Sequence, residues 1–203
     1  MLLCIYIRHI SRVITTINCM EGLMKRAVFL DRDGTINIEK EYLYQAKEFE
    51  FIPGVPEAIR LLNEAGIMVV VVTNQSGVAR GYYTEDDVEI LHRHIAQELK
   101  LHEAHIDAWL YCPHHPDGRG SYALPCMCRK PLPGMLFEAA TRYDIDLDDS
   151  IMIGDKQADI EAGIAAGCQT ILVRTGYGAE EERLAGPQTV VCADLLSAVK
   201  YLL

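Results

Sequence analysis

The sequence predicts an α/β fold with a central parallel sheet. From Arg26 onward, short apolar runs rich in β-branched residues alternate with longer segments of helical period, as in consecutive βα units. Several of these runs are apolar throughout, which is typical of strands covered by helices on both faces. With 203 residues, 50% of them hydrophobic, the chain can bury the core of one ordinary domain.

The first predicted unit runs from a strand at 27–30 to a strand at 67–73. Residues 27–30 read AVFL and are wholly apolar, so we expect a buried strand. Residues 55–65 place apolar side chains at helical spacing and end at Gly66, which suits a helix C-terminus. The run IMVVVVT at 67–73 then predicts the second strand.

The same alternation continues through the rest of the chain. Thr84 and Asp87 have the spacing of a capping box, which predicts a helix from there to about Leu101. Apolar runs and helical periodicity predict the other elements: strands at 106–112, 150–154 and 170–173, and helices at 134–143, 157–166 and 194–203.

Residues 1–23 differ from the rest, because they are apolar yet interrupted by Arg8, His9 and Arg12. The segment is too short and too broken to span a membrane. It also lacks the basic start, unbroken apolar stretch and small-residue cleavage site of a signal peptide. We expect a disordered arm or an over-called upstream start, and a folded domain at 24–203.

The charge and cysteine usage exclude several classes of partner. Nineteen basic and twenty-nine acidic residues give a net charge of -10, which repels nucleic acids and anionic membranes. An odd count of seven cysteines suits reduced thiols and a metal better than a disulfide framework. We therefore expect a cytoplasmic monomer that acts on a small molecule, with no nucleic-acid or membrane partner.

Polar side chains that can do chemistry follow four of the predicted strands. Ligands of a parallel sheet bind beyond the carboxyl ends of its strands, so folding should bring these segments to one edge. The segments are 31–35, 73–77, the loop after Cys112, and 154–156.

The first segment, DRDGT, carries two carboxylates two residues apart. Asp31 can attack phosphorus, while Asp33 can protonate the leaving oxygen and later deprotonate water. Alone, such a motif could also be a turn that caps or solvates itself, which we take as the less favoured reading.

The other segments can hold a phosphate and a cation. The Thr73 hydroxyl and the N–H groups after it suit phosphate oxygens. The Lys130 ammonium is a compact charge that can neutralise a phosphoryl group, and the planar Arg129 guanidinium can donate two parallel hydrogen bonds to one. Asp155 and Asp159 are spaced to direct carboxylates at a hard cation. Each is weak alone, since a strand-end threonine, a solvated basic pair and a helix cap are common.

A soft-donor set lies between the predicted strand 106–112 and the helix 134–143. Three thiols and an imidazole in two close pairs meet the needs of a closed tetrahedral zinc site, and the alternative is coincidence among buried thiols. Such a zinc would be structural and would fix the loop leading into Arg129 and Lys130. We do not expect His115 to be a ligand. The candidate ligands are Cys112, His114, Cys126 and Cys128.

In this order, the motifs resemble those of the haloacid dehalogenase-like phosphatases. The resemblance spans about residues 26–180 and implies a Rossmann-like three-layer sandwich with a catalytic Mg²⁺. It implies metal ligation by Asp31, the Asp33 carbonyl and Asp155, with Asp159 in support. It also implies that Asp31 is the nucleophile and Asp33 the general acid/base. The motifs are Asp31-x-Asp33-Gly34-Thr35, Thr73, Lys130 and Gly154-Asp155-x-x-x-Asp159.

With the zinc loop, the chain further resembles the heptose bisphosphate phosphatases, which remove the 7-phosphate during synthesis of activated heptose for lipopolysaccharide. Zinc-bearing histidinol-phosphate phosphatases share nearly all of these motifs and remain the alternative. The resemblance gives Thr73 and Lys130 catalytic phosphate-binding roles. The substrate contacts that it implies are Glu39, Lys40, Glu41, Tyr42, Thr73, Asn74, Gln75, Ser76, Arg129, Lys130 and Lys156.

A mobile cap commonly shields such a site, but neither Asp31 to Thr73 nor Thr73 to Lys130 leaves room for one. We therefore expect a capless fold and a substrate, such as a sugar bisphosphate, that supplies part of its own cover. An inactive zinc-stabilised interaction module is the alternative of another class. It has no need of Asp33, and a phospho-accepting receiver domain has no need of the zinc loop.

Overall fold

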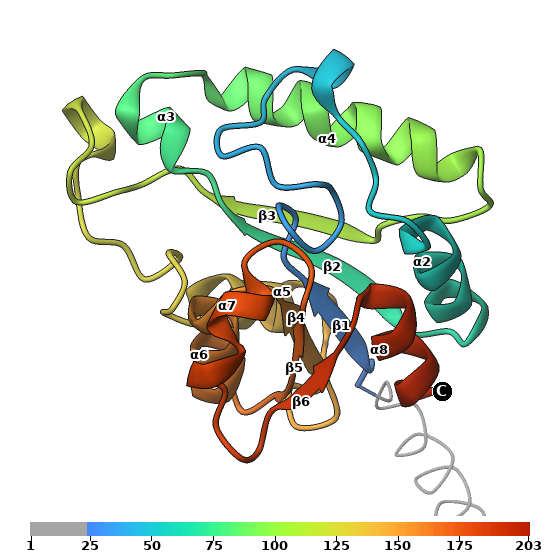
Figure 1. The fold of residues 1–203 in the computed structure, drawn as a ribbon. Helices are drawn as coiled ribbons and strands as arrows, with labels where there is room; N and C mark the ends of the chain where they lie inside the picture. The colour runs from blue at the N-terminus through green and yellow to red at the C-terminus, as the bar shows by residue number, and fades with distance from the viewer. Residues whose placement is uncertain (1–23) are drawn as a thin grey trace, which may run out of the picture.

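The computed structural model describes residues 24–203. They form three layers, a six-stranded sheet with helices on each of its two faces (Figure 1). The expectations for residues 1–23 concern a segment outside the described residues. All neighbouring strands are parallel, and their order is β3-β2-β1-β4-β5-β6. The strands are β1 (Ala27–Leu30), β2 (Met68–Asn74), β3 (Ala108–Cys112), β4 (Ile151–Gly154), β5 (Gln169–Val173) and β6 (Val190–Cys192).

The direction of the strand order reverses between β1 and β4, which places a crevice at their carboxyl ends. Leu30 of β1 aligns with Val71 of β2 on one side and with Ile153 of β4 on the other. The three strands therefore end nearly level. Whatever follows them in sequence is delivered to the same place.

Helices cover both faces of the sheet (Figure 1): α2, α4 and α8 lie on one, α5 and α6 on the other. Val28 and Leu30 pack into the first layer, and Ala27 and Phe29 into the second, as the two-residue period of a strand requires. The helices are η2 (Ala46–Glu48), α2 (Val55–Glu64), α3 (Ser76–Arg80), α4 (Glu85–Lys100), η3 (Gly120–Tyr122), α5 (Gly134–Tyr143), α6 (Gln157–Ala166), α7 (Gly178–Glu181), η4 (Glu182–Leu184) and α8 (Leu195–Leu202).

The predicted α/β class and three-layer architecture are confirmed, and the predicted strands and longer helices form within one or two residues of their expected bounds. The capping box of α4 is present: the Thr84 hydroxyl accepts from the Asp87 N–H at 3.2 Å, and an Asp87 carboxylate oxygen accepts from the Thr84 N–H at 2.8 Å. Two α-helices and one strand were not predicted, and neither were the short 3-10 helices η2, η3 and η4. Helices α3 and α7 are too short to show a period, and β6 is a half-buried edge strand.

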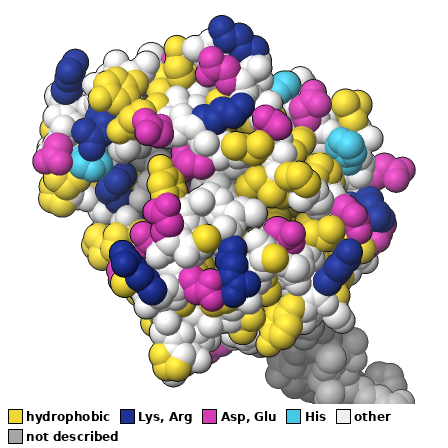
Figure 2. Space-filling view, in the orientation of Figure 1, with side chains coloured by type: hydrophobic (Ala, Val, Ile, Leu, Met, Phe, Trp, Pro, Cys, Tyr) yellow, Lys and Arg dark blue, Asp and Glu magenta, His cyan; other side chains and the backbone are white. Residues whose placement is uncertain are grey.

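The predicted absence of a cap domain holds for residues 24–203. The chain between β1 and β2 contains only η2 and α2, and the chain between β2 and β3 only α3 and α4. In this same part of the chain, no helix combines the length and apolar character needed to cross a bilayer. On the face drawn in Figure 2, acidic and basic side chains are interspersed, so no broad patch of one sign dominates that view.

Candidate active site

The described residues form a cavity of about 520 Å³ at the carboxyl ends of β1, β2 and β4. It is the crevice expected where the strand order reverses. Most of its lining comes from the segments that the sequence predicted to converge. The lining residues are Asp31, Asp33, Glu39, Glu41, Tyr42, Thr73, Asn74, Ser76, Arg129, Lys130, Lys156, Ala158, Asp159 and Tyr177.

Asp31 and Lys130 form a buried ion pair on the floor of this cavity. The Asp31 N–H donates to the Ile153 carbonyl at 3.0 Å, which ties the residue after β1 to β4. The Lys130 ammonium lies 2.9 Å from an Asp31 carboxylate oxygen and 2.6 Å from one of Asp159. It also donates to the Val72 carbonyl at 2.7 Å, so its three protons are all used. Burial would lower the pKa of Lys130, but Asp159 and Asp31 outweigh it and raise that pKa, so the residue stays charged.

The loop that carries Lys130 is clamped to the end of β2 by a side-chain amide. The Asn74 amide nitrogen donates to the Lys130 carbonyl at 3.0 Å, and the Asn74 oxygen accepts from the Lys130 N–H at 3.1 Å. This pair imitates a backbone ladder and ties Lys130, which lies on an irregular segment, to the end of β2.

A cluster of three buried carboxylates, Asp31, Asp155 and Asp159, supplies the candidate cation site. One oxygen of each lies within 4.8 Å of the others. Burial first, and then the charges of Asp31 and Asp159, raise the pKa of Asp155 to about 8. One Asp155 oxygen accepts from the Tyr177 N–H at 2.9 Å, but the other is buried without a hydrogen-bond partner among the described residues.

An unpaired oxygen among crowded carboxylates is the environment that a hard divalent cation satisfies, so the residues fit Mg²⁺. Gly34 permits this crowding, since a Cβ there would lie 2.2 Å from an Asp155 oxygen. Its φ of +87° also favours glycine. The glycine of the first motif is thus explained by the approach of Asp155.

Asp33 belongs to a different network. Its two carboxylate oxygens accept from Arg32 Nη2 at 3.1 and 2.8 Å, from Asn37 at 3.0 Å and from Gln75 at 3.1 Å. Burial alone would raise the pKa of Asp33, but Arg32 and these hydrogen bonds outweigh it and lower that pKa. These hydrogen bonds hold the carboxylate in the cavity lining beside Asp31.

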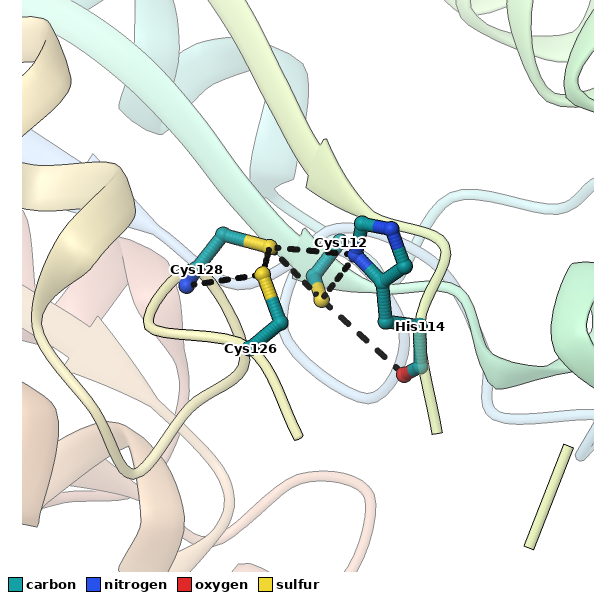
Figure 3. A group of neighbouring side chains, drawn as sticks. All are labelled: Cys112, His114, Cys126 and Cys128. Carbon is teal, nitrogen blue, oxygen red and sulfur yellow. Dashed lines mark hydrogen bonds between the residues drawn. The ribbon is translucent and has the colours of Figure 1, made fainter. Parts of the chain in front are cut away.

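The four soft donors meet as predicted, with their side chains pointing toward one another at the end of β3 and in the loop before α5 (Figure 3). The Cys128 sulfur lies 2.7 Å from that of Cys126 and 2.9 Å from that of Cys112. His114 Nδ1 lies 3.6 Å from the Cys128 sulfur. Three sulfurs and one imidazole nitrogen within 4.8 Å fit a closed zinc site.

Zinc content is therefore a direct test of this cluster. Protein purified without added metal is expected to carry about one zinc per chain, because a closed thiolate-rich site binds zinc tightly. Cys126→Ala should lose most of that zinc, whereas Cys192→Ala, on β6, should retain it. Elemental analysis that finds no soft metal in the wild-type protein would contradict the assignment.

The segment between β1 and η2, residues 31–45, here called the flap, is held to the start of α6 by an ion pair. Lys156 donates to a Glu39 carboxylate oxygen at 3.0 Å, and its ammonium lies 4.6 Å from the centre of the Tyr177 ring. The Glu41 N–H donates to the other Glu39 oxygen at 2.6 Å. These contacts bring Glu39 and Glu41 to the cavity, next to Tyr42.

Two of the predicted substrate contacts do not line the cavity. The Lys40 side chain is exposed, and its ammonium donates to the Glu48 carbonyl at 2.6 Å. Gln75 is buried beneath the cavity, where its amide donates to Asp33 and to the Thr73 hydroxyl. The side chains of Lys40 and Gln75 therefore support neighbouring structure in this arrangement.

Sequence reasoning missed Tyr177 and Arg32. Tyr177 follows the predicted strand 170–173 by four residues, so the rule applied to the other four strand ends would have found it. Arg32 gave no signal, because a charged residue between two aspartates reads as solvated. It is instead among the most buried side chains, with 1% of its surface exposed.

Comparison with known proteins agrees with this fold and site. The family described as "Haloacid dehalogenase-like hydrolase" matches residues 28–106, and the one described as "HAD-hyrolase-like" matches residues 127–198. With the parallel sheet and the acidic cavity at its carboxyl edge, these matches define the class as the haloacid dehalogenase-like hydrolases.

Relatives that match most of the chain make this class more specific. The Haemophilus influenzae protein named D-glycero-beta-D-manno-heptose-1,7-bisphosphate 7-phosphatase is 47% identical over 154 residues, 75% of this chain and 84% of that protein. The Escherichia coli K12 protein of the same name is 45% identical over 178 residues, 86% of this chain and 93% of that protein. The chain therefore belongs to the D-glycero-beta-D-manno-heptose-1,7-bisphosphate 7-phosphatase family.

Solved structures agree with this assignment. The heptose bisphosphate phosphatase from B. bronchiseptica, complexed with magnesium and phosphate, has a TM-score of 0.80 and 37% identity, covering 87% of this chain and 97% of that one. The enzyme from Burkholderia thailandensis has a TM-score of 0.67 and 31% identity, covering 88% and 98%. The resemblance predicted from the motifs is confirmed.

Proposed function

We propose that the chain removes the 7-phosphate of D-glycero-D-manno-heptose 1,7-bisphosphate through an aspartyl-phosphate on Asp31. The observation that carries the proposal is the cavity lined by Asp31, Asp33 and Lys130, in which Asp31 is paired with Lys130. The unpaired oxygen of Asp155 belongs to the carboxylate cluster that includes Asp31, although Asp155 itself does not line the cavity. A nucleophile, a phosphate-binding cation, a proton carrier and a metal site are thereby within reach of one substrate.

In the first step, an Asp31 carboxylate oxygen attacks phosphorus as the bond from phosphorus to the sugar oxygen breaks. Asp33 gives to that departing oxygen the proton that it took from water in the preceding turnover. Lys130 neutralises charge on the phosphoryl oxygens, and the Thr73 hydroxyl orients one of them. Asp31, the Asp33 carbonyl and Asp155, with Asp159 in support, would hold Mg²⁺, which would add positive charge at the phosphoryl group.

In the second step, water attacks the same phosphorus and gives its proton to the Asp33 carboxylate. The bond between phosphorus and the Asp31 oxygen breaks, which releases inorganic phosphate and restores the carboxylate. Two separate carboxylates are needed, because the residue that carries the phosphate cannot at the same time carry the proton.

The remaining cavity residues suit a phosphorylated sugar. Glu39, Glu41 and Tyr42 form a rim that can contact hydroxyl groups, and Asn74 and Ser76 lie at the end of β2. Lys156 and Arg129 provide further positive charge. A small phosphorylated sugar also agrees with the open, capless site, and a thiolate-rich zinc cluster suits a reducing compartment, so we place the enzyme in the cytoplasm.

The retained 1-phosphate is assigned to Arg129. This residue lines the cavity, follows the zinc ligand Cys128 directly and has no carboxylate partner among the described residues; its guanidinium donates only to the His114 carbonyl, at 3.3 Å. A planar fork with free donors can hold two phosphate oxygens at once. The zinc loop would then set the distance between the two phosphates.

Substrate comparison tests the proposal. We expect kcat/KM for heptose 1,7-bisphosphate to exceed that for fructose 1,6-bisphosphate and for histidinol phosphate. Arg129→Ala should lower kcat/KM at least about tenfold for the heptose bisphosphate but only slightly for p-nitrophenyl phosphate, which has no second phosphate to bind. Arg142→Ala, exposed on α5, serves as the control. A clear preference for histidinol phosphate would overturn the sugar assignment.

A further inference from the structure

The buried guanidinium of Arg32 is the largest charged group that the proposed mechanism leaves without a role. It lies between the two catalytic aspartates in sequence, with 1% of its surface exposed. Burying a charge is costly, so a cation this far from water needs several well-placed acceptors. Its acceptors are the Asp33 carboxylate, the Leu43 carbonyl, the Gln75 side-chain oxygen and His92 Nε2.

Arg32 grips the Asp33 carboxylate as a fork. Nη2 donates to both carboxylate oxygens, at 3.1 and 2.8 Å, and Nε donates to one of them at 3.3 Å. Asn37 and Gln75 each donate one further hydrogen bond, at 3.0 and 3.1 Å. The orientation of the carboxylate is therefore set by donors on three different side chains.

Arg32 is itself fixed by acceptors on elements distant in sequence. Nη1 meets His92 Nε2 of α4 at 3.3 Å, and Nη2 donates to the Leu43 carbonyl at 3.2 Å and to Gln75 at 3.3 Å. A guanidinium can only donate, so Nε2 must be the unprotonated nitrogen of a neutral imidazole. Burial, and then the Arg32 charge, lower the pKa of His92 to about 3, in agreement with that state.

His92 and Gln75 are held in turn by aromatic residues. The His92 ring stacks on Trp109 of β3 with centroids 4.5 Å apart, and the Tyr83 hydroxyl donates to the Gln75 oxygen at 2.8 Å. The chain of contacts thus runs from rigid elements to the proton carrier. A site built in this way holds its reacting group to within a fraction of an ångström.

We propose that Arg32 is a positioning residue that fixes Asp33 for both proton transfers, with His92 and Gln75 fixing Arg32. This inference rests on the proposed function and adds to it a residue that does not touch the reacting atoms. A lysine at this position would keep the positive charge but lose the fork, because an ammonium cannot bridge both oxygens in one plane.

The test is Arg32→Lys, assayed with p-nitrophenyl phosphate and heptose bisphosphate. Nitrophenolate leaves without a proton, so transfer of the phosphoryl group from the aryl phosphate to Asp31 does not need Asp33, whereas hydrolysis of the aspartyl-phosphate does. We expect kcat for the aryl phosphate to fall at least about tenfold, with kcat/KM within about threefold of wild type and a burst of nitrophenolate. For the heptose bisphosphate, kcat and kcat/KM should both fall.

A merely structural role would lower kcat and kcat/KM in parallel on both substrates without a burst, and that result would overturn the proposal. Arg93→Lys, exposed on α4, is the matched control and should behave as wild type. If Arg32→Lys does not fold, His92→Phe serves instead, because it keeps an aromatic ring on Trp109 and removes one acceptor of Arg32. With the aryl phosphate it should also lower kcat, leave kcat/KM nearly unchanged and give a burst of nitrophenolate. A His92→Phe variant without this pattern counts against the proposal.

Asp33→Asn, measured in parallel, separates failure of this inference from failure of the proposed function. Turnover retained by Asp33→Asn would refute the acid/base assignment, and the role of Arg32 with it. An inactive Asp33→Asn together with an Arg32→Lys that shows no burst would refute the positioning role alone.

Discussion

Asp31→Asn is expected to lower turnover at least about 100-fold and to leave the fold intact, because it removes the nucleophile and keeps the side-chain volume. The Asp31 carboxylate is almost fully buried and points at Lys130, 2.9 Å away. An amide oxygen is a poor nucleophile toward phosphorus. The other two carboxylates of the described cluster, Asp155 and Asp159, follow β4 and cannot take the position of Asp31 at the end of β1. Initial rates with p-nitrophenyl phosphate in saturating Mg²⁺ measure the effect.

Two further measurements make this result specific. Brief reaction of the wild-type protein with labelled substrate, followed by acid quenching, should leave phosphate on the chain that hydroxylamine removes, and Asp31→Asn should leave none. Asp107→Asn is a suitable control, because its carboxylate accepts from the Val69 N–H at 2.7 Å and does not line the cavity. More than about a tenth of wild-type turnover in Asp31→Asn would rule out Asp31 as the nucleophile.

The elements that the sequence predicted well are those whose pattern is imposed by the core. The predicted strand 27–30 and helix 134–143 match β1 and α5 at both ends. Their apolar residues must pack in the core, and this requirement imposes the strand or helix period on the sequence. The convergence of Asp31, Thr73 and Asp155 was predictable for a related reason. The carboxyl ends of parallel strands share one edge, whatever the details of the loops.

What could not be predicted depends on contacts between distant segments. The direction of the Lys40 side chain is decided by the Glu48 carbonyl, eight residues away in a flap without periodicity. The burial of Arg32 requires His92, sixty residues later, and nothing in either local sequence indicates the pair. The cluster of three cysteines and one histidine was an exception, because the chemistry of a zinc site fixes the residue types and groups them in close pairs.

The acidic cluster also has an energetic cost that a bound cation offsets. Burial and the neighbouring carboxylates raise the pKa of Asp155 from 3.8 to about 8. The folded protein therefore binds more protons than the unfolded chain between these two pH values. Without divalent metal, the free energy of unfolding should fall as pH rises across this window, by at most about 1.4 kcal/mol per pH unit for this one group.

Asp155→Asn is accordingly expected to stabilise the metal-free protein while removing its activity. In EDTA at pH 8, the variant should unfold at a temperature several degrees higher, since about 2 kcal/mol corresponds to roughly 4 to 8 °C for a domain of this size. The amide keeps the shape of the carboxylate and carries no charge to desolvate. Turnover in Mg²⁺ should fall at least about 100-fold, because a ligand of the proposed cation site is lost.

Added Mg²⁺ distinguishes a metal ligand from a residue that is only strained. Mg²⁺ should raise the unfolding temperature of the wild-type protein and reverse the order of the two proteins, because a ligand that binds only the folded state stabilises it by mass action. Asp155→Asn should respond little. Asp146→Asn, half-buried in the segment before β4, should behave as wild type in both conditions. A variant Asp155→Asn that is less stable than wild type in EDTA would contradict this prediction. It would mean that the buried Asp155 carboxylate stabilises the metal-free protein, although one of its oxygens has no hydrogen-bond partner among the described residues. The cation site would then have to be placed elsewhere.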